Sequence, residues 1–157
     1  MRKGQAAMEF LMTYGWAILV VLIAIGALAY FGFLNPNKLL SDRCVITSGS
    51  GMDCQDYNAD VSANTVTLRI RNLLDRSIII GASGGSLAYD IDGTTGTCTS
   101  GAVTINPGSS GDLAFNACGL TGNTGKKLKG DATITYTLGT GGLTKTTAGS
   151  LIVTIGA

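Results

Sequence analysis

The chain begins with a long apolar segment that no charge interrupts. After Glu9 the next charged residue is Lys38, and positions 10–34 are apolar apart from Thr13 and three glycines. A helix needs about 20 such residues to cross the hydrocarbon core of a bilayer. A helix packed on a small soluble domain would instead carry a polar face. The pattern therefore predicts a membrane-spanning helix.

The flanks of this segment predict its orientation and the division of the chain. Arg2 and Lys3 precede it, so the positive-inside rule places the N-terminus in the cytoplasm and the rest of the chain outside. The apolar run exceeds the 7 to 15 residues of a cleaved secretory signal, so we expect the mature protein to keep it. We predict a hydrophobic helix over residues 5–34, a linker containing Pro36 over residues 35–41, and an extracellular β-rich domain over residues 42–157.

Beyond the linker, short segments alternate between hydrophobic and polar positions. Alternation predicts strands at 65–71, at 133–138 and in part of 151–155. Weaker strand candidates lie at 77–80, 87–91, 102–105, 113–115 and 143–146. Glycine clusters predict turns at 83–85, 106–108 and 139–142. The expected fold class is α+β, with a long N-terminal hydrophobic α-helix followed by a small antiparallel β-sandwich or barrel-like domain.

The four cysteines all lie in the predicted extracellular domain. An even number of cysteines outside the cytoplasm implies disulfides, with three possible connectivities. Proximity in the sequence favours Cys44 with Cys54 and Cys98 with Cys118. Zinc sites use closer spacing, such as two cysteines separated by two residues, so disulfides are the preferred interpretation.

Composition argues against enzymatic chemistry. The chain has no histidine, the commonest general base near neutral pH, and it carries no recognisable catalytic motif. We therefore expect no enzyme, no cofactor and no metal. A formal net charge of +1 offers little attraction for nucleic acid, which we do not expect as a partner.

Two local patterns have an ordinary structural interpretation. Asp90, Asp92 and Gly93 resemble the start of a calcium loop, but Glu9 is the only glutamate in the chain, so the closing ligand of an EF-hand is missing. We interpret them as a turn that ends a strand. The basic cluster at 126–129 is predicted to be a solvated loop rather than a binding patch.

The N-terminal sequence resembles a known processing signal. The stretch Arg2-Lys3-Gly4-Gln5-Ala6-Ala7-Met8-Glu9-Phe10 resembles the class III signal peptide of archaeal type IV pilins, and the resemblance covers about the first 35 residues. In that family a membrane aspartyl prepilin peptidase cleaves between the glycine and the glutamine. The resemblance implies a signal peptide over residues 1–4, cleavage between Gly4 and Gln5, and a family glutamate at Glu9, the fifth mature residue.

Glu9 has two interpretations. A carboxylate inside an apolar helix is costly in lipid, so it needs a partner or a place near the headgroups. Cleavage would create the α-amine of Gln5, which is positively charged near pH 7 and could pair with Glu9 of the same or a neighbouring subunit during assembly. Alternatively, Glu9 merely sits favourably near the positive end of the helix dipole. We favour the assembly role.

These features together predict a structural protein. The resemblance implies a subunit of an archaeal type IV pilus-like surface filament used in adhesion and surface attachment. Such a subunit sits in the cell membrane as a precursor, is processed by prepilin peptidase, and is then built by pilus assembly machinery into a homo-oligomeric extracellular filament. The alternative is a minor pseudopilin, or a membrane-anchored extracellular binding module, of a secretion or uptake system.

Overall fold

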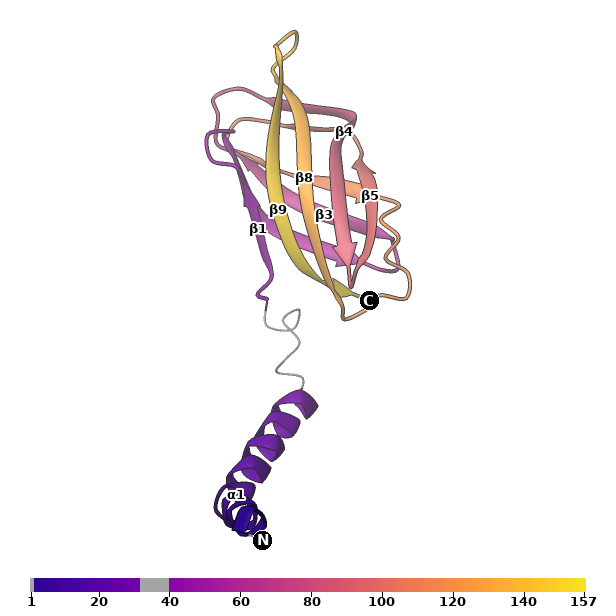
Figure 1. Ribbon diagram of the computed structural model, residues 1–157. Coiled ribbons are helices and arrows are strands. Elements are labelled where there is room, and N and C mark those ends of the chain that lie inside the picture. Colours follow the sequence, from indigo (N-terminus) through magenta and orange to yellow (C-terminus); the bar gives the residue numbers. More distant parts are fainter. Residues whose placement is uncertain (1, 32–39) are drawn as a thin grey trace. The chain divides into compact units, whose positions relative to one another are not determined.

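The computed structural model describes residues 2–31 and 40–157 and divides into two compact units, Met1–Leu40 and Ser41–Ala157. The first unit contains one helix, α1, over Arg2–Tyr30, and Phe31 follows it as a turn (Figure 1). The helix begins three residues earlier than predicted, because nothing in Arg2-Lys3-Gly4 stops a helix. Its predicted end at Leu34 and most of the predicted linker lie outside the described residues.

Helix α1 is apolar on all sides. Its stretch Ala7–Tyr30 has a mean hydropathy of 2.3, and it is long and apolar enough to cross a membrane. Large apolar side chains such as Phe10, Trp16 and Leu22 are each at least 60% exposed. A helix of this composition is compatible with a membrane anchor or a signal sequence.

The second unit is built of β-strands. Nine strands occur within residues 40–157. Their bounds are β1 Arg43–Ile46, β2 Met52–Asp60, β3 Thr65–Asn72, β4 Ile78–Ile91, β5 Thr94–Ser100, β6 Val103–Ile105, β7 Ser110–Asn116, β8 Lys127–Leu138 and β9 Thr144–Gly156. An apolar helix followed by a β-rich domain is the arrangement expected from the sequence.

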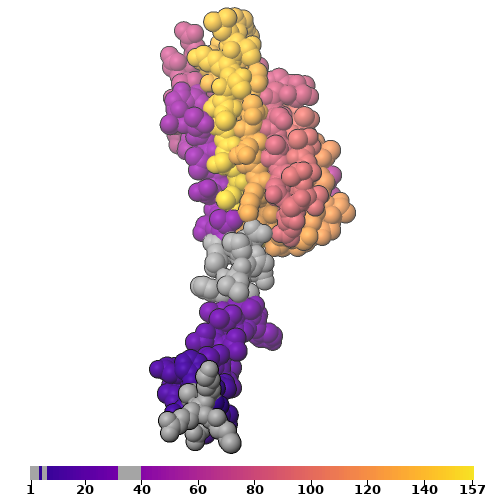
Figure 2. Space-filling view, viewed as in Figure 1, coloured from indigo at the N-terminus to yellow at the C-terminus, as the bar shows by residue number. Residues whose placement is uncertain are grey.

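Seven of these strands close into a barrel. The ring runs β9-β2-β3-β7-β5-β4-β8 and returns to β9, while β1 pairs with a further part of β9 and β6 with a further part of β4. Every ladder is antiparallel except the one between β2 and β9, which is parallel and departs from the expected all-antiparallel domain. Figure 2 shows β9 and β8 running side by side along the visible face of the domain.

The barrel is closed unevenly. The ladders β9–β2 and β5–β7 contain two residue pairs each, whereas the other five contain between six and eleven. We call these two short ladders the β2–β9 seam and the β5–β7 seam. They divide the ring into a sheet of β2, β3 and β7 and a sheet of β5, β4, β8 and β9. The domain is therefore a flattened barrel made of two sheets joined at two seams.

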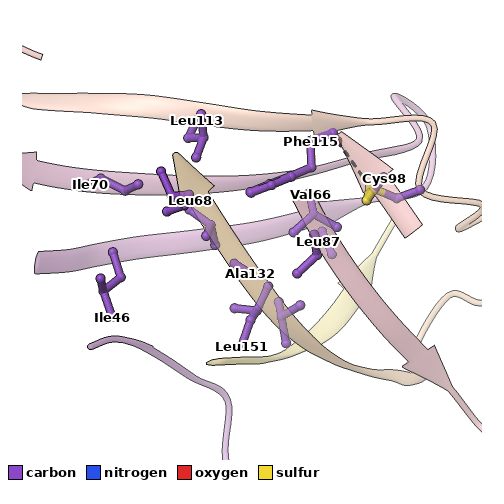
Figure 3. Close-up of a cluster of buried hydrophobic side chains, with 14 of the residues drawn as sticks. Ile46, Val66, Leu68, Ile70, Leu87, Cys98, Leu113, Phe115, Ala132 and Leu151 are labelled. Carbon is purple, nitrogen blue, oxygen red and sulfur yellow. Dashed lines mark hydrogen bonds between the residues drawn. A yellow bond between two sulfur atoms is a disulfide. The ribbon is translucent and has the colours of Figure 1, made fainter. Parts of the chain in front are cut away.

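The core lies between the two sheets. Alternate residues of β3 and β7 point inward, and the side chains of Val66, Leu68, Leu113 and Phe115 are at most 1% exposed. They face inward-pointing residues of β4, β8 and β9, among them Leu87, Ala132 and Leu151 (Figure 3). Burying large aliphatic and aromatic side chains in this way is the main favourable contribution to folding.

The prediction of a turn at Ser83-Gly84-Gly85 is wrong. These residues lie inside β4, whose pairing with β8 shifts register between Ile80 and Gly85. At this bulge, neighbouring atoms approach the glycines too closely to leave room for a side chain. A Cβ on Gly84 would lie 2.9 Å from the Gly81 carbonyl oxygen, and one on Gly85 would lie 2.6 Å from the Ser100 hydroxyl. The turns predicted at 106–108 and 139–142 are confirmed.

A fully buried asparagine organises one end of the barrel. The side-chain amide of Asn72 donates to the carbonyl oxygens of Arg76 (2.7 Å) and Ile105 (3.0 Å). Its side-chain oxygen accepts from the amide of Leu74 at 2.9 Å. One side chain thus fixes the loop that leaves β3 against the end of β6.

We expect Asn72→Ala to lower the free energy of unfolding by about 2–4 kcal/mol, because backbone groups of these loops would lose their partner inside the protein. Denaturant unfolding of the full chain in detergent, followed by circular dichroism, measures this loss. Asn58→Ala on the exposed face of β2 is the matched control and should change the free energy by less than about 0.5 kcal/mol. Equal losses for the two variants would contradict the role of Asn72.

Candidate processing and assembly segment

The predicted cleavage site lies at the start of α1. Gly4 and Gln5 both belong to the helix in the uncleaved chain, and Gly4 is exposed. A Cβ built on Gly4 would meet nothing within 4 Å, and its φ does not require glycine. Packing within the chain therefore does not explain a glycine at this position. The side chain of Gln5 lies outside the described residues.

Glu9 lies one helical turn after Gln5. Residues four apart share a helix face, and Cα–Cβ bonds tilt toward the helix N-terminus, so the Glu9 side chain projects back toward the first turn. Glu9 is exposed, and its carbonyl oxygen accepts from the Thr13 hydroxyl at 2.8 Å. The predicted partner of Glu9 is an amine that only cleavage would create, and their pairing stays a prediction.

Both disulfides have the connectivity that sequence proximity favoured. Cys44 in β1 is bonded to Cys54 in β2, and Cys98 in β5 is bonded to Cys118 beyond the end of β7. Cys98 and Cys118 are at most 3% exposed, whereas Cys44 and Cys54 are partly exposed. The Cys98–Cys118 bond spans the β5–β7 seam, and the Cys44–Cys54 bond joins β1, which pairs with β9, to β2 of the other sheet. Disulfides are typical of proteins outside the reducing cytoplasm.

The point where the chain enters the barrel carries an ion pair. Asp42 accepts from the Lys127 ammonium, from the Thr154 hydroxyl at 2.9 Å and from the Thr154 amide at 3.2 Å. Partial burial alone would raise the pKa of Asp42, but the hydrogen bonds from Lys127 and Thr154 outweigh it and lower this pKa below its ordinary value. Asp42 therefore joins the residue before β1 to β8 and β9.

Other charged groups form surface pairs. Arg69 on β3 binds both carboxylate oxygens of Asp112 on β7, at 2.7 and 2.9 Å. The predicted strand-ending turn is confirmed, since the amide of Gly93 donates to Asp90 at 2.7 Å between β4 and β5. Lys126 pairs with Asp92 at 3.6 Å.

No three His, Cys, Asp or Glu side chains in residues 2–31 and 40–157 gather as metal ligands would. An open hollow of about 600 Å³ lies on the outer face of the larger sheet, where Ala88, Thr97, Asp131 and Ser150 contribute to its lining. Its lining includes no cysteine and no histidine.

Comparison with known proteins shows no family. No family model matches the chain, and no curated protein matches it. Among solved structures, a crystal structure of a protein from Archaeoglobus fulgidus aligns with a TM-score of 0.32 and 14% identity, over 75% of this chain and 98% of that one. This likeness assigns neither a family nor a function.

We expect the ion pair of Asp42 to make stability depend on pH. Because the pKa of Asp42 is lower in the folded than in the unfolded protein, its contribution is complete above its ordinary value of 3.8 and is lost as the pH falls through the folded value. Asp42→Asn should therefore lose stability near neutral pH and show a shallower decline from about pH 5 to about pH 2.5.

Urea titrations of the full chain in detergent at a series of pH values measure this slope. Lys127→Gln removes the partner instead of the acid, and it should reduce the slope in the same direction as Asp42→Asn. A decline in Asp42→Asn that runs parallel to the wild type would show that Asp42 does not contribute.

Proposed function

We propose that this chain is a structural subunit of an archaeal type IV pilus-like surface filament that serves in adhesion and surface attachment. The observation that carries the proposal is the spacing of Gly4, Gln5 and Glu9 at the start of an apolar helix. A peptidase that recognises Gly4 and Gln5 would explain a glycine that packing in this chain does not require.

The exposed surface of α1 supports assembly through this helix. Most of its large apolar side chains are more than half exposed in the isolated helix, so they need either lipid or other helices around them. In the membrane, lipid supplies that environment. Once the subunit leaves the bilayer, only helices of other subunits can replace it, and many copies packed side by side would bury α1 in the centre of a filament.

The β-domain suits the outside of such a filament. Removing Met1 to Gly4 takes away Arg2 and Lys3, which leaves 11 − 2 = 9 basic against 10 acidic side chains. Near-neutral copies repel each other little when they are crowded along a fibre. Two disulfides, each worth about 2–4 kcal/mol, support a domain that must stay folded outside the cell.

We expect prepilin peptidase to cleave between Gly4 and Gln5. Co-expression of the chain with the membrane peptidase, followed by mass spectrometry of the purified product, should give an N-terminus at Gln5. Gly4→Val is the test variant, because a bulky side chain at this position should leave Met1 or Arg2 at the N-terminus. A product cut beyond Leu34 would remove the assembly helix and contradict the proposal.

We expect Glu9→Ala to insert into the membrane and fail to assemble. Losing a carboxylate lowers the cost of insertion by up to about 2.5–3.5 kcal/mol. In the filament, however, the α-amine of Gln5 would remain in an apolar core without its partner, and leaving one half of a buried ion pair typically costs about 3–5 kcal/mol. The subunit should therefore accumulate in the membrane fraction.

The measurement compares membrane protein with sheared surface filaments for wild type and variant. Thr13→Ala is the matched control, because it removes another polar side chain of the same helix and should leave filament yield unchanged. Normal filaments from Glu9→Ala would remove the assembly role of this residue. A wild-type chain that is cleaved but scarce in sheared filaments would favour a minor pseudopilin.

A further inference from the structure

Strand β1 connects the N-terminal part of the chain to the barrel, yet few contacts attach this strand to the domain. It is four residues long, and Ile46 is its only well-buried side chain. Val45 is 52% exposed. Its ladder with β9 contains four pairs, from Arg43–Ile152 to Ile46–Gly149. A strand this short has little core contact to keep it in place.

Any tension on the N-terminal segment enters the domain through this strand. The first contacts to bear this tension are the bonds from Asp42 to Lys127 and Thr154, and the next is the ladder pair between Arg43 and Ile152. These are non-covalent contacts at a partly exposed site, and such surface ion pairs contribute little individually. They would open before the core does.

The next residue is Cys44, and it is covalently bonded to β2. Cys54 lies in a strand with eight ladder pairs to β3, and this strand is anchored in the core by Ala59, which is fully buried. Tension that reaches Cys44 therefore passes to β2 and bypasses the chain between the two cysteines. That bypassed chain has 54 − 44 − 1 = 9 residues and contains the rest of β1.

We infer that the Cys44–Cys54 disulfide is a mechanical crosslink, which transfers tension from the N-terminal segment to β2 and prevents β1 from being peeled off the barrel. The second disulfide has a different position. Cys98 and Cys118 join β5 to the chain beyond β7 across the β5–β7 seam, and neither of these strands pairs with β1. The inference requires only that α1 is held while the domain is pulled, so it stands whether or not the chain forms a filament.

Optical tweezers can test this on the full chain in detergent. One handle is fused ahead of Met1, and the other is inserted between Gly141 and Gly142, in the turn that joins β8 to β9. The test variant is Cys44→Ser/Cys54→Ser, and the matched control is Cys98→Ser/Cys118→Ser, which removes a disulfide that closes a longer loop. Extension of α1 occurs in every variant and does not distinguish them.

We expect the test variant alone to show an early step, at a force below that of barrel unfolding. Its length should be roughly 30 Å, which is nine residues at about 3.3–3.6 Å each. Wild type and the control should lack this step, although the control is expected to lose global stability. The same first event in all three proteins, or a 30 Å early step in wild type, would overturn the inference.

Folded wild-type protein provides a second route if the test variant does not fold. Brief treatment with tris(2-carboxyethyl)phosphine should reduce the partly exposed Cys44–Cys54 before the buried Cys98–Cys118, and alkylation with peptide mapping identifies which bond is open. Molecules with only Cys44–Cys54 reduced should gain the early step. Its absence from molecules mapped in this way would also overturn the inference.

Discussion

The β-domain depends on closing a barrel whose two halves share few hydrogen bonds. The β2–β9 and β5–β7 seams contribute two residue pairs each, so backbone ladders alone hold the two sheets together weakly. Core packing between the sheets and two disulfides, one across the β5–β7 seam and one from β1 to β2, supply what the ladders lack. The disulfides thus link the two sheets on the two sides where the hydrogen-bonded ladders between them are short.

The two units of the chain expose opposite kinds of surface, apolar on the helix and polar on the barrel. Helix α1 satisfies its backbone internally and leaves apolar side chains outside, which suits lipid or a bundle of identical helices. The barrel buries most of its large apolar side chains and leaves many threonines and charged residues outside, which suits water. In the proposed filament, this separation would let the chain pass from a bilayer to a fibre without refolding, since only the surroundings of α1 would change.

Much of this architecture was predictable where periodicity is regular. The charge-free run indicated the helix, and the alternation of Thr65 to Arg71 indicated β3, because that strand has no bulge and one face is fully buried. Strand β2 was missed because its register with β3 shifts between Cys54 and Asp56, so the inward positions change phase within the strand. The same effect divided β4 into two predicted segments with a false turn between them.

Other elements were hidden by composition. In β5 the inward residues are small, and Gly96 is covered by Tyr89 from the neighbouring strand, so no apolar alternation marks the segment. The ion pair of Asp42 was also missed, because Asp42, Lys127 and Thr154 are far apart in the sequence and no local pattern joins them. The cysteine connectivity was accessible because both bonds join the nearer partner in sequence.

The bond between Asp42 and Thr154 also places the start of β1 and the end of β9 at the same pole of the barrel. The turn at 139–142 lies at the other end of β9, about 34 Å away for ten residues of extended strand. A break in the chain within this turn would therefore remove no ladder pair of the barrel. A circularly permuted domain, with Ala157 linked back to Ser41 and new ends between Thr140 and Gly141, would retain every ladder. Such a permuted domain could be inserted into a loop of a host protein, because both of its ends would lie at the pole of the 139–142 turn. The loops at the opposite pole could then be changed without affecting the junctions with the host.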